Sequence, residues 1–174
     1  IPFPRLVVHG NHDIPLFDLV RRFARPLARF RRYIDEHVDP FFSTDAVAVL
    51  GMNTARSNTW KDGRLSLAQI DDLRRRLGRL PPHVSKVVVT HHPFLPPPGD
   101  PSPPLVGRAA EALQAAEACG VDLVLSGHLH RGYTGDIRTH HVDIRRGILV
   151  AQAGTAASHR VRNEANGYNV LELS

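Results

Sequence analysis

Three short clusters of polar residues carry the side chains that are best suited to chemistry in this sequence. They are Gly10-Asn11-His12-Asp13, Thr90-His91-His92-Pro93 and Gly127-His128-Leu129-His130. Imidazole is the commonest metal ligand among side chains, and together with carboxylate and amide oxygens it suits iron, manganese, zinc or cobalt. A single histidine is more often an ordinary polar residue than a ligand. Three such clusters in one chain, however, predict a metal centre.

Other catalytic arrangements are missing from the sequence. It has no Gly-x-Ser-x-Gly elbow for a nucleophilic serine, and its one cysteine, Cys119, falls in an alanine-rich helical pattern. One cysteine allows no internal disulfide and does not suit a structural zinc site. We therefore interpret Cys119 as a core residue, and we expect a cytoplasmic protein.

Each polar cluster directly follows a segment that is predicted to be a buried strand. These segments are Arg5–Val8, Val84–Thr90 and Val121–Leu125. Because sites in α/β proteins lie at the carboxyl ends of strands, the three segments would bring the clusters to one edge of a sheet. Three further strands are predicted, at Ala46–Leu50, Gly147–Ala153 and Tyr168–Leu173.

Three helices are predicted between the strands. Apolar residues spaced by three and four indicate an amphipathic helix over Leu16–Ile34, broken at Pro26, with arginines on its other face. The second helix covers Ser66–Leu77 and starts with a capping box, and the third covers Ala109–Cys119 and ends at a glycine. The alternation of strands and helices is typical of an α/β fold.

A proline-rich segment follows the second cluster. Six prolines between Phe94 and Leu105 exclude regular structure there. A loop of this length above a strand end is typical of a lid or a binding segment. The alternative is a surface insertion without a role in the site.

Composition predicts one globular domain over residues 1–174. The chain is 42% hydrophobic and 22% charged, which excludes collagen-like and fully disordered chains. No uninterrupted apolar run approaches the roughly 18 residues that a membrane-spanning helix needs. The formal net charge of +5 favours anionic partners, and the alternative is that the basic run at helical spacing is a solvated face, which is the more common case. Nucleic acid is not favoured, because no aromatic residues interleave with the basic run to stack on bases.

In order and spacing, the three clusters resemble the last three motifs of the calcineurin-like metallophosphoesterases, over about Leu6 to Leu173. The bacterial branch with cyclic-nucleotide phosphodiesterase-like proteins is the most similar. The resemblance implies a four-layer α/β/β/α sandwich and a metal-dependent phosphoester hydrolase. Its dinuclear site would activate hydroxide for in-line attack on a phosphodiester or phosphomonoester. Two metal ions (Mn, Fe, Zn or Co) and a phosphorylated small molecule or nucleotide as substrate are implied.

The resemblance also implies a set of metal ligands. Asn11, His91 and His128 would bind the second metal, and His130 would bind the first. Between the adjacent histidines of the second cluster, the family pattern favours His91 over His92 as the ligand.

Roles next to the substrate follow from the same resemblance. His12 would stabilise the phosphoryl oxygens or protonate the leaving alkoxide, and Asp13 would fix its orientation. His92 would orient or touch the substrate. Apart from the resemblance, Arg131 next to the third cluster could bind the non-reacting part of the substrate, and a solvated surface position is the equal alternative. His9 matches no ligand of the family and is interpreted as an ordinary polar residue.

The sequence departs from the family at its beginning. Family members open with Asp-x-His and Gly-Asp, which supply ligands of the first metal and the aspartate that bridges both metals, and neither motif precedes Gly10 here. We therefore expect the chain to be the C-terminal two-thirds of the domain, without its N-terminal strand-helix-strand, and to be inactive or weakly active by itself. The alternative is a non-catalytic remnant of the fold that serves as a metal-binding or interaction module.

Overall fold

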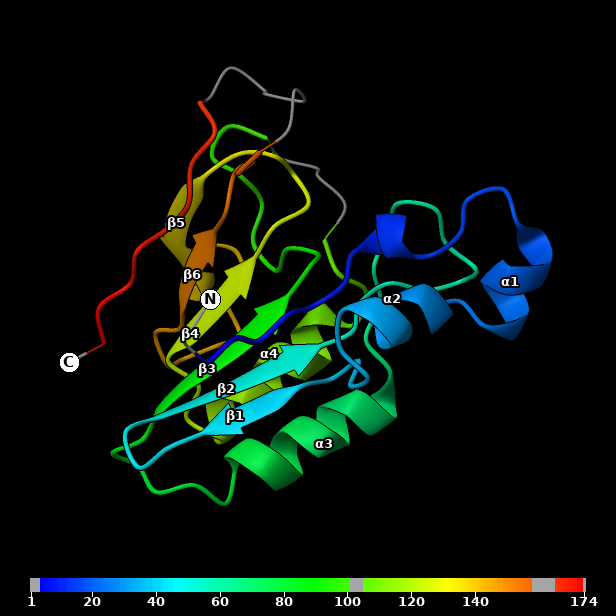
Figure 1. Cartoon of the computed structure of the whole chain (residues 1–174). Coiled ribbons are helices and arrows are strands. Elements are labelled where there is room, and N and C mark those ends of the chain that lie inside the picture. Colours follow the sequence, from blue (N-terminus) through cyan, green and yellow to red (C-terminus); the bar gives the residue numbers. More distant parts are fainter. Residues whose placement is uncertain (1–3, 101–104, 158–164, 174) are drawn as a thin grey trace.

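Six strands form one mixed sheet in the order β1-β2-β3-β4-β6-β5 (Figure 1). The computed structural model describes residues 4–100, 105–157 and 165–173. Four central strands run parallel, and antiparallel β1 and β5 form the edges. The strands are β1 (Phe41–Ser43), β2 (Val47–Met52), β3 (Ser85–Thr90), β4 (Leu123–Ser126), β5 (Tyr133–Asp136) and β6 (Leu149–Gln152).

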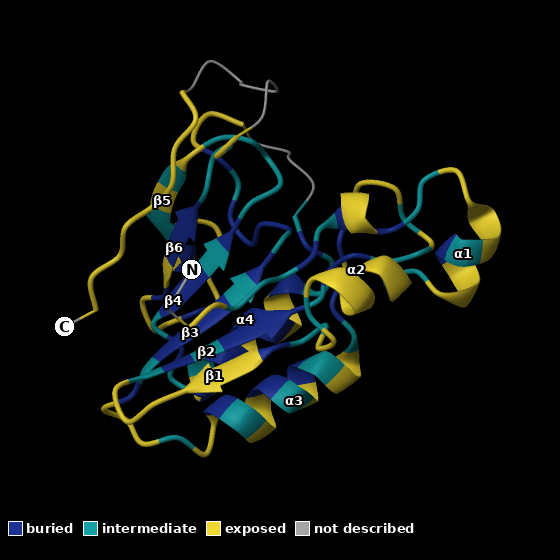
Figure 2. Cartoon of the chain, in the orientation of Figure 1, coloured by how far each residue is buried: buried dark blue, intermediate teal, exposed yellow. Residues whose placement is uncertain are grey.

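The helices fall into two groups. The longer ones, α3 and α4, pack on the same face of the sheet, whereas α1 and α2 lie beyond its end and are largely exposed (Figures 1 and 2). The helical elements are α1 (Leu19–Ala24), α2 (Ala28–Tyr33), α3 (Leu67–Leu77), α4 (Ala109–Ala118) and the short 3-10 turns η1 (Asn11–Asp13) and η2 (Ile137–Thr139).

The main core lies between the sheet and α3 and α4. Leu50, Val88 and Val124 from three neighbouring strands meet Ile70 of α3 and Leu113 of α4, and all five side chains are buried. Burying such side chains contributes about 1.5–3 kcal/mol each. Alternate residues of the same strands point to the other face, where a smaller apolar cluster forms.

The start of α3 shows how the sequence sets its elements locally. The Ser66 hydroxyl accepts a hydrogen bond from the Gln69 amide at 3.2 Å, and the Gln69 side chain accepts one from the Ser66 amide at 3.0 Å. This reciprocal pair is the predicted capping box, and it satisfies two donors that would otherwise lack partners at the helix start.

Parallel pairing places the carboxyl ends of β2, β3 and β4 at one edge of the sheet. Met52 pairs with Thr90, and Leu125 at the end of β4 pairs with Val89. The segments that follow these strands, which begin at Asn53, at His91 and at Gly127, therefore leave the sheet side by side.

The mixed α/β class and most of the predicted elements are confirmed. The helix predicted over Leu16–Ile34 is present as α1 and α2, interrupted around Pro26, and the strands predicted at Ala46–Leu50 and Gly147–Ala153 are β2 and β6. Among the residues that the structure describes, no helix is both long and apolar enough to cross a membrane. Of the four layers implied by the family, these residues contain one sheet with helices on one face.

Two predicted strands are wrong. Arg5–Val8 pairs with no strand among the described residues, although Val8 lies against Gly51 of β2. A segment becomes a strand through backbone pairing, and both positions beside β2 are taken by β1 and β3. Tyr168–Leu173 also forms no strand in its described residues and is exposed, because its apolar side chains meet no buried face.

Candidate metal centre

Asn11, His91 and His128 bring three ligand atoms together at the carboxyl edge of the sheet. The Nε2 atom of His91 lies 3.0 Å from Oδ1 of Asn11 and 3.1 Å from Nδ1 of His128. One ring nitrogen carries at most one hydrogen, so His91 cannot donate to both neighbours. Metal–ligand bonds of about 2.1 Å at right angles place their donor atoms about 3.0 Å apart. The spacing of the three atoms therefore fits a shared metal ion.

Local contacts orient two of these donors. The side-chain amide of Asn11 donates a hydrogen bond to the Trp60 carbonyl at 3.1 Å, which turns its Oδ1 toward His91. The ring of His91 occupies the space where a Cβ at Gly10 would stand, within 2.7 Å of a ring atom. Groups that orient ligands in this way tune metal affinity.

His128 reaches the cluster through an unusual backbone conformation. Its φ is 77°, and that of His130 is 56°, both in the left-handed region that residues with a Cβ rarely adopt. Such conformations cost on the order of 1–3 kcal/mol and concentrate at functional sites. Gly127 between β4 and His128 gives the chain room to turn, since among the described residues a Cβ there would meet only the His91 carbonyl, at 3.9 Å.

The structure does not bring His130 to this group. Its Nδ1 is hydrogen-bonded to the Thr155 hydroxyl at 2.9 Å. The histidines that do gather, with ligand atoms within 4.8 Å of one another, are His91, His92 and His128.

His92 is fully occupied by protein contacts. It is only 1% exposed, and its Nε2 lies 2.9 Å from the Lys61 carbonyl and its Nδ1 2.7 Å from the Thr54 hydroxyl. A carbonyl only accepts, so Nε2 carries the hydrogen and Nδ1 accepts one from Thr54. Neither ring nitrogen is therefore free to bind a metal or to touch a substrate while these bonds persist.

Burial keeps two of these histidines, His91 and His92, uncharged. Desolvation, followed by repulsion from His92, His128 and His12, lowers the pKa of His91 to about 3. Desolvation and repulsion from His128 lower the pKa of His92 to about 4. At neutral pH both rings are neutral, which is the form in which imidazole binds metal ions.

His12 and Asp13 lie on the surface next to this group. They line a groove of about 690 Å³ that also contains Arg21, Arg29 and Tyr33 from α1 and α2. The Asp13 carboxylate accepts a hydrogen bond from the Gly10 amide at 2.8 Å, which closes the 3-10 turn that carries Asn11.

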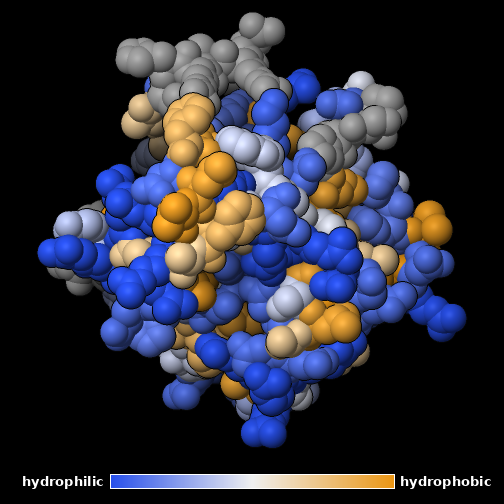
Figure 3. All heavy atoms as spheres, turned by 90° about the vertical axis from the view of Figure 1, so that its right-hand side faces the viewer, coloured by the Kyte–Doolittle hydropathy of each residue, from blue (hydrophilic) through white to orange (hydrophobic). Residues whose placement is uncertain are grey.

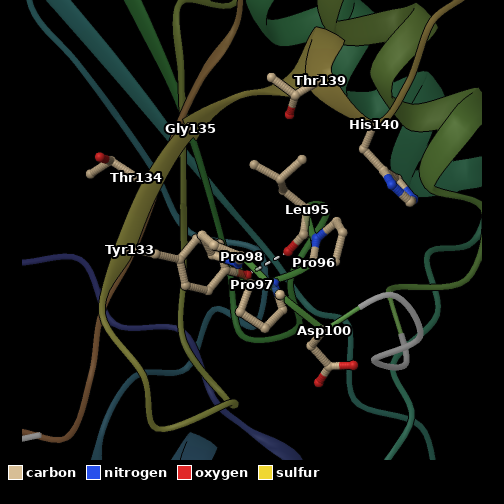
Figure 4. A pocket seen from close by; sticks show the side chains of 11 residues that line it. Leu95, Pro96, Pro97, Pro98, Asp100, Tyr133, Thr134, Gly135, Thr139 and His140 are labelled. Carbon is tan, nitrogen blue, oxygen red and sulfur yellow. Dashed lines mark hydrogen bonds between the residues drawn. The ribbon is translucent and has the colours of Figure 1, made fainter.

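A second groove lies beside the proline-rich segment (Figure 4). Leu95 and the three prolines after it form one side, and Tyr133 of β5 forms the other, with a volume of about 630 Å³. The Tyr133 hydroxyl donates to the Leu95 carbonyl, and burial raises the pKa of this phenol to about 12. Phe94 and Leu95 are buried, so the described start of the segment is part of the core. Arg131, two residues before Tyr133, is half-buried.

Several residues that shape the site are not recognisable from the sequence. The carbonyls of Trp60 and Lys61 and the space at Gly63 come from a loop with no motif of its own. Thr54, which contacts His92, differs from these residues because it follows the predicted strand Ala46–Leu50, and a position beyond a strand end is a signal that could identify it. His9, interpreted as an ordinary polar residue, is buried with both ring nitrogens unpartnered among the described residues.

Comparison with known proteins agrees with this geometry. A family model described as calcineurin-like phosphoesterase matches residues 1–132, a range that includes all three polar clusters. None of the curated proteins compared with the chain matches it.

Proposed function

Because the chain belongs to the calcineurin-like phosphoesterase family, we propose that its histidine cluster is the metal centre of a phosphoester hydrolase. The observation that carries the proposal is the convergence of Asn11, His91 and His128, with donor atoms 3.0 and 3.1 Å apart. An amide oxygen and two imidazole nitrogens suit a first-row transition metal such as Mn, Fe, Zn or Co. When bound, metal ions supply positive charge against the phosphoryl oxygens and activate water for attack.

The proposal assigns two metal ions to the complete site. Asn11, His91 and His128 hold one of them, and His130 contributes to the other once its ring leaves Thr155. His92 positions this group instead of binding metal, because it is buried against His91 and His128 with ring centroids 4.9 and 4.5 Å apart. Thr54 and Lys61 keep His92 in that orientation.

His12 is assigned to the reaction itself. It is exposed, it adjoins Asn11 in the same 3-10 turn, and it lines the groove of η1, α1 and α2. A protonated imidazole there offsets charge on the phosphoryl oxygens and donates a proton to the departing alkoxide. Asp13 acts through the turn, because its carboxylate binds the Gly10 amide. Substrates are phosphodiesters or phosphomonoesters, and Arg131 binds their non-reacting part.

Two measurements test the proposal. The first is metal content of the chain, which should fall in His91→Ala and His128→Ala but not in His83→Ala, an exposed histidine just before β3. The second is hydrolysis of bis(p-nitrophenyl) phosphate with Mn²⁺ by the protein. His12→Ala should lower its rate by about 10²- to 10⁴-fold at unchanged metal content, the usual contribution of a general acid.

The outcomes separate two functions. A metal-stimulated rate that depends on His12 supports the hydrolase. Bound metal without metal-stimulated hydrolysis contradicts the hydrolase and favours the metal-binding module. The hydrogen bond of the His130 ring to Thr155 is consistent with this second function.

A further inference from the structure

The segment of residues 17–34, which holds α1 and α2, carries the net charge of the whole chain. It contains six arginines and a single acidic residue, Asp18, so its formal net charge of +5 equals that of all 174 residues. The remainder of the chain is neutral by the same count. Only Arg21 among these arginines forms an ion pair within the described structure, with Asp18 at 3.5 Å. The positive charge is thus concentrated and largely uncompensated.

The same segment exposes large apolar side chains. Phe17 is 91% exposed and Val20 81%, and Leu19 and Phe23 are more than half exposed. We call these four residues the α1 patch. The face of the molecule that carries α1 shows apolar side chains gathered among hydrophilic ones (Figure 3). A cluster of this kind with a polar border is typical of an interaction surface.

Some apolar residues of this amphipathic segment are buried, and others are exposed. Leu27 and Phe30 are buried in a small cluster with Ile14 and Ala55, and they attach the helices to the rest of the chain. The α1 patch comes from the same periodic pattern but points away from that cluster. Some apolar residues of this pattern therefore do not pack against any described residue of the core and stay exposed to solvent.

A buried arginine connects the α1 patch to the metal centre. Arg22 is 2% exposed and donates hydrogen bonds to the carbonyls of Pro15, Ser57 and Thr59. Its guanidinium lies 4.8 Å from the centre of the Trp60 ring, and the Trp60 carbonyl orients Asn11. The helix that carries the patch is thus fixed to the loop that positions a metal donor.

We propose that the α1 patch and its arginines dock onto an anionic lipid bilayer. Apolar side chains surrounded by arginines suit the bilayer interface, where the former insert shallowly and the latter meet lipid phosphates. A symmetric pair of chains would bring two strongly positive surfaces together. A nucleic acid would leave the apolar side chains of Leu19 and Val20 against phosphates. Because His12 shares a groove with Arg21 and Arg29, the site would then take phosphoesters held at the membrane surface. This substrate class rests on the proposed function, whereas the docking does not.

Vesicle flotation tests the docking. The chain should float with vesicles of equal phosphatidylcholine and phosphatidylglycerol, should not float with phosphatidylcholine alone, and should bind less as salt is added. Val20→Ser combined with Phe23→Ser should lower the partition coefficient about tenfold or more. Val142→Ser is the matched control, because Val142 is 84% exposed on another part of the surface. Arg25→Ala with Arg32→Ala should weaken binding to the anionic vesicles, and Arg79→Ala should not.

Further readouts distinguish this proposal from the proposed function. The Val20→Ser, Phe23→Ser variant should keep its melting temperature and its rate on soluble bis(p-nitrophenyl) phosphate, because neither residue contacts the site. Vesicle binding by a protein that hydrolyses nothing would support the docking and contradict only the substrate class. The docking is overturned if the unmodified chain binds neither vesicle. It is also overturned if sedimentation shows that the substitutions dissociate a dimer while vesicle binding is unchanged.

Discussion

A methyl group added at Gly10 should weaken metal binding without weakening the fold. Gly10 has φ −105° and ψ −177°, an extended conformation that alanine adopts freely. A Cβ there would lie 2.7 to 2.9 Å from three atoms of the His91 ring, closer than side chains approach one another. The ring is the end of a flexible side chain, so it can turn away while the backbone stays in place.

The expected effects of Gly10→Ala have opposite signs. Turning the His91 ring separates Nε2 from Asn11 and His128, which lie 3.0 and 3.1 Å away. Misoriented ligands typically lower metal affinity about 10- to 100-fold. Replacing glycine in a compatible conformation stabilises a protein by about 0.4–1 kcal/mol through the unfolded chain. The metal-free variant should therefore be as stable as the unmodified chain or slightly more so.

Isothermal titration with Mn²⁺ and thermal unfolding in EDTA measure the two effects separately. Gly167→Ala is the matched control, because no described residue lies within 4 Å of a Cβ at that position, and it should leave metal affinity unchanged. Equal affinity in Gly10→Ala and the unmodified chain would refute the reasoning, since it would mean that His91 contributes no ligand at this position.

Two other predictions concern the histidines and their supports. Acid should destabilise the metal-free chain, because His91 and His92 have pKa values of about 3 and about 4 in the folded chain, against 6.5 for an ordinary histidine. Between the folded pKa of each histidine and 6.5, the unfolded chain binds more protons than the folded chain. The contribution of the neutral histidines to the free energy of unfolding is therefore complete above pH 6.5 and decreases as the pH falls. The decrease is up to about 1.4 kcal/mol per pH unit for each histidine. Urea unfolding at several pH values measures this slope, which should decrease in His91→Gln; an unchanged slope would contradict the assignment. Gly63→Ala should lower the free energy of unfolding by about 1–3 kcal/mol, as overpacking does, because its Cβ would lie 2.2 Å from Nδ1 of buried His92. A thermal melt of Gly63→Ala that matches that of Gly167→Ala would argue against this packing.

Local signals in the sequence located most of the helices and strands. They were wrong where strand formation depends on backbone pairing with a distant segment. The capping box before α3, the break at Pro26 and the apolar run of β3 each act within a few residues, and all three are present in the structure. Arg5–Val8 has the composition of a strand but pairs with no strand in the part of the chain that the structure describes. Periodicity likewise predicted the helices of residues 16–34, but it did not show which of their apolar residues would be buried.

The sequence by itself determined the chemical types at the site. Amide and imidazole donors occur in three clusters that follow predicted strands. The order and spacing of these clusters were sufficient to indicate a metal centre and a family. These properties belong to single residues and their near neighbours, so they can be recognised without knowledge of the fold.

Only the tertiary structure decided which donors meet. Asn11 and His91 are 80 residues apart, and their 3.0 Å contact depends on sheet register, on the Trp60 carbonyl and on the space at Gly10. His130 belongs to the same short motif as His128, yet its ring bonds Thr155, because a side chain's direction depends on its rotamer and on its partners from elsewhere in the chain. The types of the ligand residues could thus be recognised in the sequence. The distances between their donor atoms and the directions of their side chains depend on contacts between segments that are far apart along the chain.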